Sequence, residues 1–272
     1  MQVIIRPNAK AAVELVAQVI AAALRDHPRL VLGLATGATM EAVYARLSAL
    51  HRKEGLDFSA CHTFNLDEYV GLPAEHPNSY RHYMNRHLFS RVNLDLRNTH
   101  LPDGTAADLA AECQKYEALI GQAGGIDLQL LGIGRSGHIG FNEPLSAINS
   151  RTRVVWLASA TLAQNVRHFK NPTQMPRQAI TMGVATIMEC RRCLLLATGP
   201  DKAEVLARAI EGPLAAMVPA SALQIHSDCI VVADASAASR LQGKQDYERA
   251  FQNDPKWQRF LQPAPAIAAD KR

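Results

Sequence analysis

Two adjacent acidic residues with apolar neighbours are the first candidates for proton-transfer chemistry. Asp67 and Glu68 follow a short apolar run. Neighbours in an extended chain point to opposite faces, so we expect one carboxylate to face a ligand and the other to bind backbone or a helix end. Partial desolvation raises the pKa of a carboxylate, which suits a base that works near neutral pH. A solvated acidic turn is the alternative, and four apolar neighbours count against it, Phe64, Leu66, Tyr69 and Val70.

A glycine-rich segment, residues 132–144, contains the second set of reactive side chains. Four of its first nine residues are glycine, which indicates a tight backbone that approaches another group closely. His138 and Glu143 lie five residues apart in this segment. Histidine titrates near physiological pH and can transfer protons in both directions. A lone histidine is more often structural, but glycines around it and an acid nearby favour a catalytic residue.

An anion site is indicated where an apolar run gives way to a helical pattern, at Thr36-Gly37-Ala38-Thr39. Gly37 allows close approach of a ligand, and the N–H groups of the following helix attract negative charge. An ordinary N-cap by Thr39 is equally compatible, because the segment is neither a Walker A motif nor G-x-G-x-x-G. Arg167 and Lys202 are cations that suit a phosphate, with solvated surface charge as the alternative.

The elements that would position these residues alternate between strand and helix. Short, continuously apolar runs predict strands at 3–5, 30–34, 62–66, 128–133, 154–157, 193–198 and 229–233. Apolar spacing of three and four predicts helices at 10–25, 40–53, 78–89, 106–121 and 202–211. This alternation predicts an α/β protein, a Rossmann-like three-layer sandwich with a mostly parallel sheet and helices on both faces. We expect one domain over residues 1–261 and a flexible tail over 262–272.

Composition excludes several classes of protein. The 272 residues are 48% hydrophobic and 20% charged, with a net charge of +4, which predicts a folded protein that binds no nucleic acid. The longest apolar stretches are far shorter than the roughly 20 residues that span a bilayer. Five cysteines, an odd number, indicate reduced thiols and a cytoplasmic protein. Cys190 and Cys193 form one C-x-x-C pair, which we interpret as two thiols at the start of a buried strand rather than a metal site.

Taken together, the motifs resemble those of the glucosamine-6-phosphate deaminase family, from the first strand to about Leu241. The similar segments are 35–39 (ATGAT), 64–72 (FNLDEYVGL), 137–144 (GHIGFNEP), 150–153 (SRTR), 223–226 (LQIH) and 231–234 (VVAD). The resemblance implies conversion of glucosamine 6-phosphate and water to fructose 6-phosphate and ammonia, without a metal or an organic cofactor. It also implies a small-molecule amino-sugar phosphate as the partner, and a monomer or a homo-oligomer.

The resemblance assigns roles to individual residues. Asp67 matches the base that moves a proton from C2 to C1 of the open-chain sugar. His138 matches the residue that opens the pyranose ring, and Glu143 the acid that supports it. The residues that the resemblance places at the substrate and its phosphate are Thr36, Gly37, Ala38, Thr39, Glu68, Gly137, Arg167 and Lys202.

This chain departs from the family pattern beside the histidine. Ser136 stands where the family has an aspartate that hydrogen-bonds the catalytic histidine, and a hydroxyl cannot stabilise an imidazolium as a carboxylate does. Arg135 replaces a usually smaller residue and could recruit a different ligand group. We therefore keep three alternatives: another amino-sugar phosphate such as galactosamine 6-phosphate, a 6-phosphogluconolactonase-like hydrolase, and a non-catalytic sugar-phosphate sensor.

A second departure concerns regulation. Some hexameric relatives bind N-acetylglucosamine 6-phosphate through a serine pair, an arginine and a lysine. Ser146 and Arg153 match two of these residues, but Ala147 and Val155 stand at the other two. We expect weak or no activation by that ligand.

Overall fold

Six of the predicted apolar strands, together with a short strand at residues 99–100, form a seven-stranded sheet in which every pairing is parallel. The computed structural model describes residues 1–169 and 171–261. Along the sheet the strands are β1 (Gln2–Arg6), β10 (Cys229–Asp234), β9 (Arg192–Ala197), β6 (Leu128–Gly132), β2 (Val31–Leu34), β3 (His62–Asn65) and β5 (Thr99–His100).

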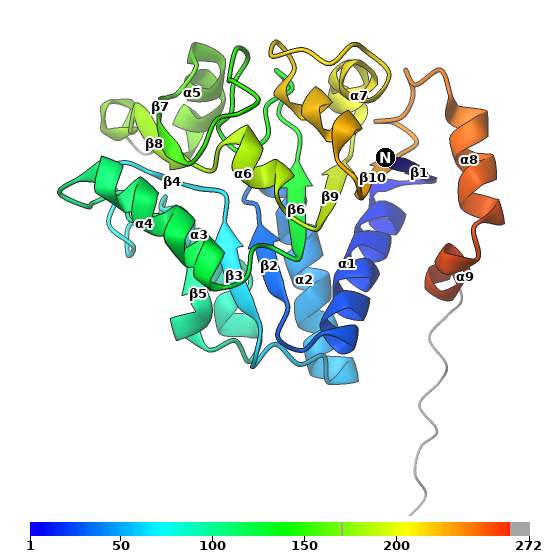
Figure 1. Ribbon diagram of the computed structural model, residues 1–272, viewed down its shortest axis with the longest axis horizontal. Coiled ribbons are helices and arrows are strands. Elements are labelled where there is room, and N and C mark those ends of the chain that lie inside the picture. Colours follow the sequence, from blue (N-terminus) through cyan, green and yellow to red (C-terminus); the bar gives the residue numbers. More distant parts are fainter. Residues whose placement is uncertain (170, 262–272) are drawn as a thin grey trace, which may run out of the picture.

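Helices cover both faces of this sheet. Figure 1 shows α2 behind the sheet and α4 and α6 in front of it, which confirms the predicted three-layer α/β sandwich. The helices are α1 (Ala9–Asp26), α2 (Ala38–Glu54), α3 (Tyr80–His87), α4 (Leu109–Gln122), α5 (Ser159–Asn165), α6 (Val184–Met188), α7 (Ala203–Ile210), α8 (Lys244–Asn253) and α9 (Pro255–Leu261). Short 3-10 helices are η1 (Phe89–Arg91), η2 (Leu96–Asn98), η3 (Val166–His168), η4 (Pro172–Gln174), η5 (Pro200–Lys202) and η6 (Pro219–Ile225).

Helix α1 illustrates how the sequence pattern sets the packing. Its Asn8 N-cap accepts a hydrogen bond from the N–H of Ala11, which satisfies one of the free donors at the helix start. Its buried side chains recur at spacings of three and four and face the core, for example Ala12, Leu15, Val16, Val19 and Ile20. One hydrophobic cluster joins this helix to the strands and reaches from Val3 to Trp257.

A second, smaller sheet lies beside the carboxyl ends of the main strands. It is antiparallel, in the order β4 (Asp67–Tyr69), β8 (Gln178–Thr181) and β7 (Arg153–Trp156). The strand predicted at 154–157 therefore belongs to this sheet and not to the parallel one. An apolar run predicts that a strand is buried, but it does not predict which strand pairs with it. Its own apolar cluster includes Tyr69, Phe141 and Phe169.

The sequence pattern does not predict several elements, among them β5, β8, α5, α6, α8 and α9. Most of these elements are short, and α8 is largely polar with one buried side chain, so few apolar residues mark them in the sequence. The tail expected at 262–272 lies outside the described residues. Among the described residues, no helix is long and apolar enough to span a membrane.

Candidate active site

Three loops that follow neighbouring parallel strands meet around one cavity. Strands β9, β6 and β2 are adjacent in the sheet, so their carboxyl ends lie side by side (Figure 1). The loops after them, 35–39, 133–138 and 198–202, supply much of the wall of a cavity of about 500 Å³. This is the edge of an open α/β sheet where ligands bind.

Asp67 lies in the wall of this cavity. It is the first residue of β4, where it pairs with Thr181 of β8, and it is 5% exposed. Burial, and next the negative charge of Glu68, raise the pKa of Asp67 to about 8. A carboxyl group with such a pKa can exchange protons near neutral pH, as a general base must.

The backbone opposite Asp67 comes unusually close to it. Gly140 has φ +57°, and a Cβ at this position would lie 3.3 Å from Oδ2 of Asp67 and 2.9 Å from Oγ1 of Thr181. A larger residue would therefore meet both the strain of that backbone conformation and the crowding. The positive φ and the short contacts explain why the sequence motif has glycine at position 140.

Glu68 has the structural role expected for one of the two acids. Its carboxylate accepts hydrogen bonds from the N–H groups of Tyr69 (2.8 Å), Tyr80 (2.9 Å) and Arg81 (2.9 Å). The last two belong to the first turn of α3, so Glu68 satisfies free donors at a helix start. It does not line the cavity, and its proposed contact with the substrate has no counterpart in this arrangement.

His138 is held from its Nδ1 side. Nδ1 lies 2.9 Å from Oγ of Ser136 and 3.1 Å from Oε2 of Glu143. The hydroxyl of Ser136 also donates to the same carboxylate oxygen at 2.8 Å. The serine thus links the histidine and the acid, and Nε2 is the ring nitrogen that remains for proton transfer within the cavity.

Glu143 has a further partner, Thr161 of α5, whose hydroxyl donates to Oε1. Burial acts to raise the pKa of Glu143, but hydrogen bonds from His138, Thr161 and Ser136 outweigh it and hold the pKa below its ordinary value. Glu143 is therefore a carboxylate that can stabilise an imidazolium. Sequence reasoning missed Thr161, because nothing around it resembles a motif and the fold alone brings it to residue 143.

Part of the cavity wall is suited to a phosphate. Thr36, Gly37, Ala38 and Thr39 all line it, and the last two begin α2, whose N-terminal N–H groups favour an anion. Lys202 also lines it, with Nζ donating to the carbonyl of Ile133 at 2.7 Å. Burial and then the charge of Arg135 lower the pKa of Lys202.

Two of the residues assigned from the resemblance lie elsewhere. Arg167 is exposed on η3 and does not line the cavity. Gly137 also lies outside the lining, and its carbonyl accepts the N–H of Ala220. Of the predicted site residues, the structure brings together Asp67, His138, the 36–39 loop and Lys202 in the wall, with Ser136 and Glu143 directly behind His138.

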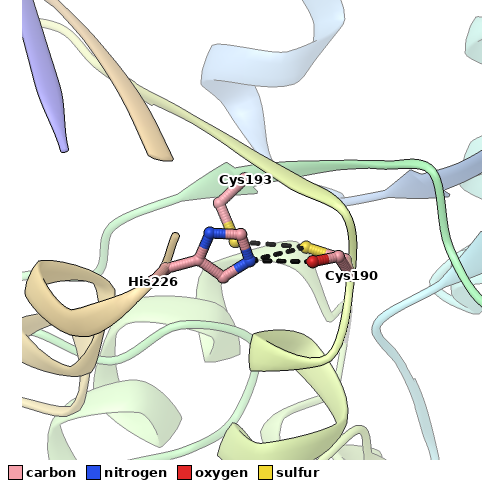
Figure 2. Close-up of side chains that lie close together, drawn as sticks. All are labelled: Cys190, Cys193 and His226. Atoms are coloured by element: carbon pink, nitrogen blue, oxygen red, sulfur yellow. Dashed lines mark hydrogen bonds between the residues drawn. The ribbon is translucent and has the colours of Figure 1, made fainter. Parts of the chain in front are cut away.

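A separate cluster outside the cavity has the residue types of a metal site. Cys190 and Cys193, both buried, have their sulfur atoms 3.3 Å apart, and Nε2 of His226 lies 3.6 Å from the sulfur of Cys190 (Figure 2). His226 directly follows η6 and ends the 223–226 segment, but its spacing from the two cysteines is not that of a metal-binding motif. However, Nδ1 of His226 accepts the N–H of Asp228 at 3.0 Å, so the ring proton belongs on Nε2.

That proton has its own acceptor. Nε2 of His226 lies 2.8 Å from the carbonyl oxygen of Cys190. With its proton donated there, Nε2 has no lone pair to offer a metal ion. The residues therefore do not fit a metal centre in this arrangement. Cys193 lies at the start of β9, as the sequence indicated, whereas Cys190 lies two residues before that strand.

Comparison with known proteins adds to this geometry. The family model described as glucosamine-6-phosphate isomerases/6-phosphogluconolactonase matches residues 7–232. The chain belongs to this family. A glucosamine-6-phosphate deaminase of Streptomyces coelicolor is 47% identical over 95% of this chain and 99% of its own length. One from a Geobacillus strain is 51% identical over 82% of this chain and 89% of its own length.

Solved structures agree with the assignment to this family. A monomeric glucosamine-6-phosphate deaminase superposes with a TM-score of 0.86 at 44% identity, covering 88% of this chain and 100% of that chain. A 6-phosphogluconolactonase from Trypanosoma cruzi has a TM-score of 0.69 at 20% identity, over 89% of this chain and 97% of its own. The second likeness is one of fold.

Proposed function

We propose that this protein is a glucosamine-6-phosphate deaminase, which converts glucosamine 6-phosphate and water to fructose 6-phosphate and ammonia. One observation carries the proposal: Asp67, His138 and the cationic end formed by the 36–39 loop and Lys202 line the same cavity. Relatives with that name, at 47–51% identity over most of the chain, support the same activity.

Ring opening is the first step that the site can perform. Nε2 of His138 takes the proton of the anomeric hydroxyl and returns a proton to the ring oxygen, which breaks the C1–O5 bond. Glu143 stabilises the transient imidazolium through its contact with Nδ1. Ser136 keeps both groups in place through its two hydrogen bonds.

Isomerisation and deamination follow at C1 and C2. Asp67 removes the proton from C2 of the open-chain sugar while O1 takes up a proton, which gives an enolamine. The proton on Asp67 is then delivered to C1, and the nitrogen at C2 loses a proton. The resulting C2 imine adds water and releases ammonia, which leaves the ketone of fructose 6-phosphate. The bound phosphate contributes binding energy that holds C2 against Asp67.

The test is a panel of hexosamine 6-phosphates, with ammonia release as the readout from the purified protein. We expect glucosamine 6-phosphate to give the largest kcat/KM. Ammonia only from galactosamine 6-phosphate would redirect the assignment to that epimer. No ammonia from any member, with hydrolysis of 6-phosphogluconolactone, would replace the deaminase by a lactonase, and inertness towards all of them would indicate a sensor.

We also propose that the protein acts in the cytoplasm, as a monomer or a homo-oligomer. All five cysteines are free and buried, as suits a reducing compartment. The substrate and product are small sugar phosphates of central metabolism, which supports the same location.

Replacing Ser136 by aspartate tests how much the site depends on the hydroxyl. We expect Ser136→Asp to keep or raise the deaminase kcat/KM, because a carboxylate beside Nδ1 of His138 stabilises the imidazolium more strongly than a hydroxyl. The assay is ammonia release, with circular dichroism to verify folding. A folded variant without activity would show that the site has been rebuilt around the serine and its bond to Glu143.

A further inference from the structure

The phosphate end of the cavity has a cation that the family resemblance does not assign. Arg167, one of the two expected cations, is exposed and outside the lining, whereas Arg135 lines the cavity together with Lys202. Its guanidinium forms an ion pair with Asp201, with Nη2 2.5 Å from Oδ2. Asp201 directly precedes Lys202, and the charge of Arg135 acts on Lys202, so the two cations lie near each other in the wall.

We propose that Arg135 binds the substrate phosphate by exchanging Asp201 for phosphate oxygens. This inference rests on the proposed function and names a specificity residue of the same site. The side chains of Arg135 and Asp201 are 67% and 64% exposed. An ion pair this exposed contributes little to stability, so leaving it costs little.

The chemistry at this end favours the exchange. A guanidinium presents a planar fork of donors that matches two phosphate oxygens, whereas the ammonium of Lys202 acts as a point charge. The charge of Arg135 also contributes to lowering the pKa of Lys202, after burial, which shows that the two cations repel each other. A dianion bound between them relieves that repulsion and is attracted by both.

The first experiment compares Arg135→Gln with Arg240→Gln. Arg240 forms an equally exposed pair with Glu204, at 65% and 62%, away from the cavity lining, which makes it a matched control. For Arg135→Gln we expect KM for glucosamine 6-phosphate to rise about tenfold, the scale of one charged hydrogen bond, with a much smaller effect on kcat. The Ki of inorganic phosphate as a competitive inhibitor rises by a similar factor, and Arg240→Gln changes neither constant.

A second variant, Asp201→Asn, releases Arg135 from its partner. We expect Asp201→Asn to have a lower Ki for inorganic phosphate than the wild type. When Asp201→Asn is added to Arg135→Gln, the Ki should decrease by a smaller factor, because the guanidinium is no longer there to be released. An unchanged KM in folded Arg135→Gln overturns the proposal, as does a raised KM with an unchanged phosphate Ki. If the wild-type protein released no ammonia, the proposed function would fail, while calorimetric titration with inorganic phosphate would still test Arg135 by the same comparison.

Discussion

Asp67→Asn is expected to lower kcat for ammonia release from glucosamine 6-phosphate by about 10²–10⁴-fold, the usual contribution of a positioned general base. The amide has nearly the shape of the carboxyl group but cannot take the C2 proton. KM changes far less, because the 36–39 loop and Lys202 remain to bind the phosphate. Steady-state kinetics measure both constants, and a kcat within about threefold of the wild type would remove Asp67 from the reaction.

The stability of Asp67→Asn at different pH values provides a control for its loss of activity. The pKa of Asp67 is about 8 in the folded protein, against an ordinary value of 3.8. The folded state therefore holds a proton that the unfolded chain has lost, so wild-type stability falls as pH rises from about 4 to about 8. The amide of the Asp67→Asn variant does not titrate. The free energy of unfolding of the variant, minus that of the wild type, is therefore expected to be about 1–5 kcal/mol larger at pH 8 than at pH 5.

Urea unfolding of both proteins at pH 5 and pH 8 measures this difference. A stability difference that does not change between these pH values would contradict the raised pKa of Asp67. Inactivity together with this gain at pH 8 would show that the lost activity does not come from misfolding. It would also show that the catalytic carboxylate is maintained at a cost to the fold.

His138→Gln is the second substitution with a large expected effect. We expect kcat/KM on glucosamine 6-phosphate to fall by about 10²–10⁴-fold, because glutamine cannot shuttle a proton between the anomeric hydroxyl and the ring oxygen. His51→Gln is the control, since His51 is a half-buried histidine outside the cavity whose Nδ1 contacts the carbonyl of Leu56. Equal losses in both variants would mean that His138 acts through stability and not through proton transfer.

The position of the site could be predicted from the sequence because it depends on strand order at one edge. Continuous apolar runs located β2, β6 and β9, and parallel strands present their carboxyl ends together. The distinction between Asp67 and Glu68 followed from the alternation of side chains, although it did not tell which acid faced the cavity. The cavity itself settles that question in favour of Asp67.

Other parts of the site depend on contacts between segments distant in the sequence. Thr161 reaches Glu143 only because α5 folds over the cavity, and β8 supplies Thr181 beside Asp67 from a strand without a clear pattern. Arg167 was placed at the phosphate from its residue type and from the resemblance, and neither records how η3 packs. Such contacts follow from tertiary structure, which local periodicity does not record.

In the proposed complex, Asp67 reaches C2 while the phosphate lies between Lys202 and the start of α2. A crystal structure with an open-chain 2-amino-alditol 6-phosphate, which has no carbonyl and cannot react, tests this most directly. We predict a carboxyl oxygen of Asp67 about 3–3.5 Å from C2 and phosphate oxygens within hydrogen-bond distance of the N–H groups of residues 37–39 and Nζ of Lys202. A phosphate bound elsewhere, or a C2 atom out of reach of Asp67, would contradict the account.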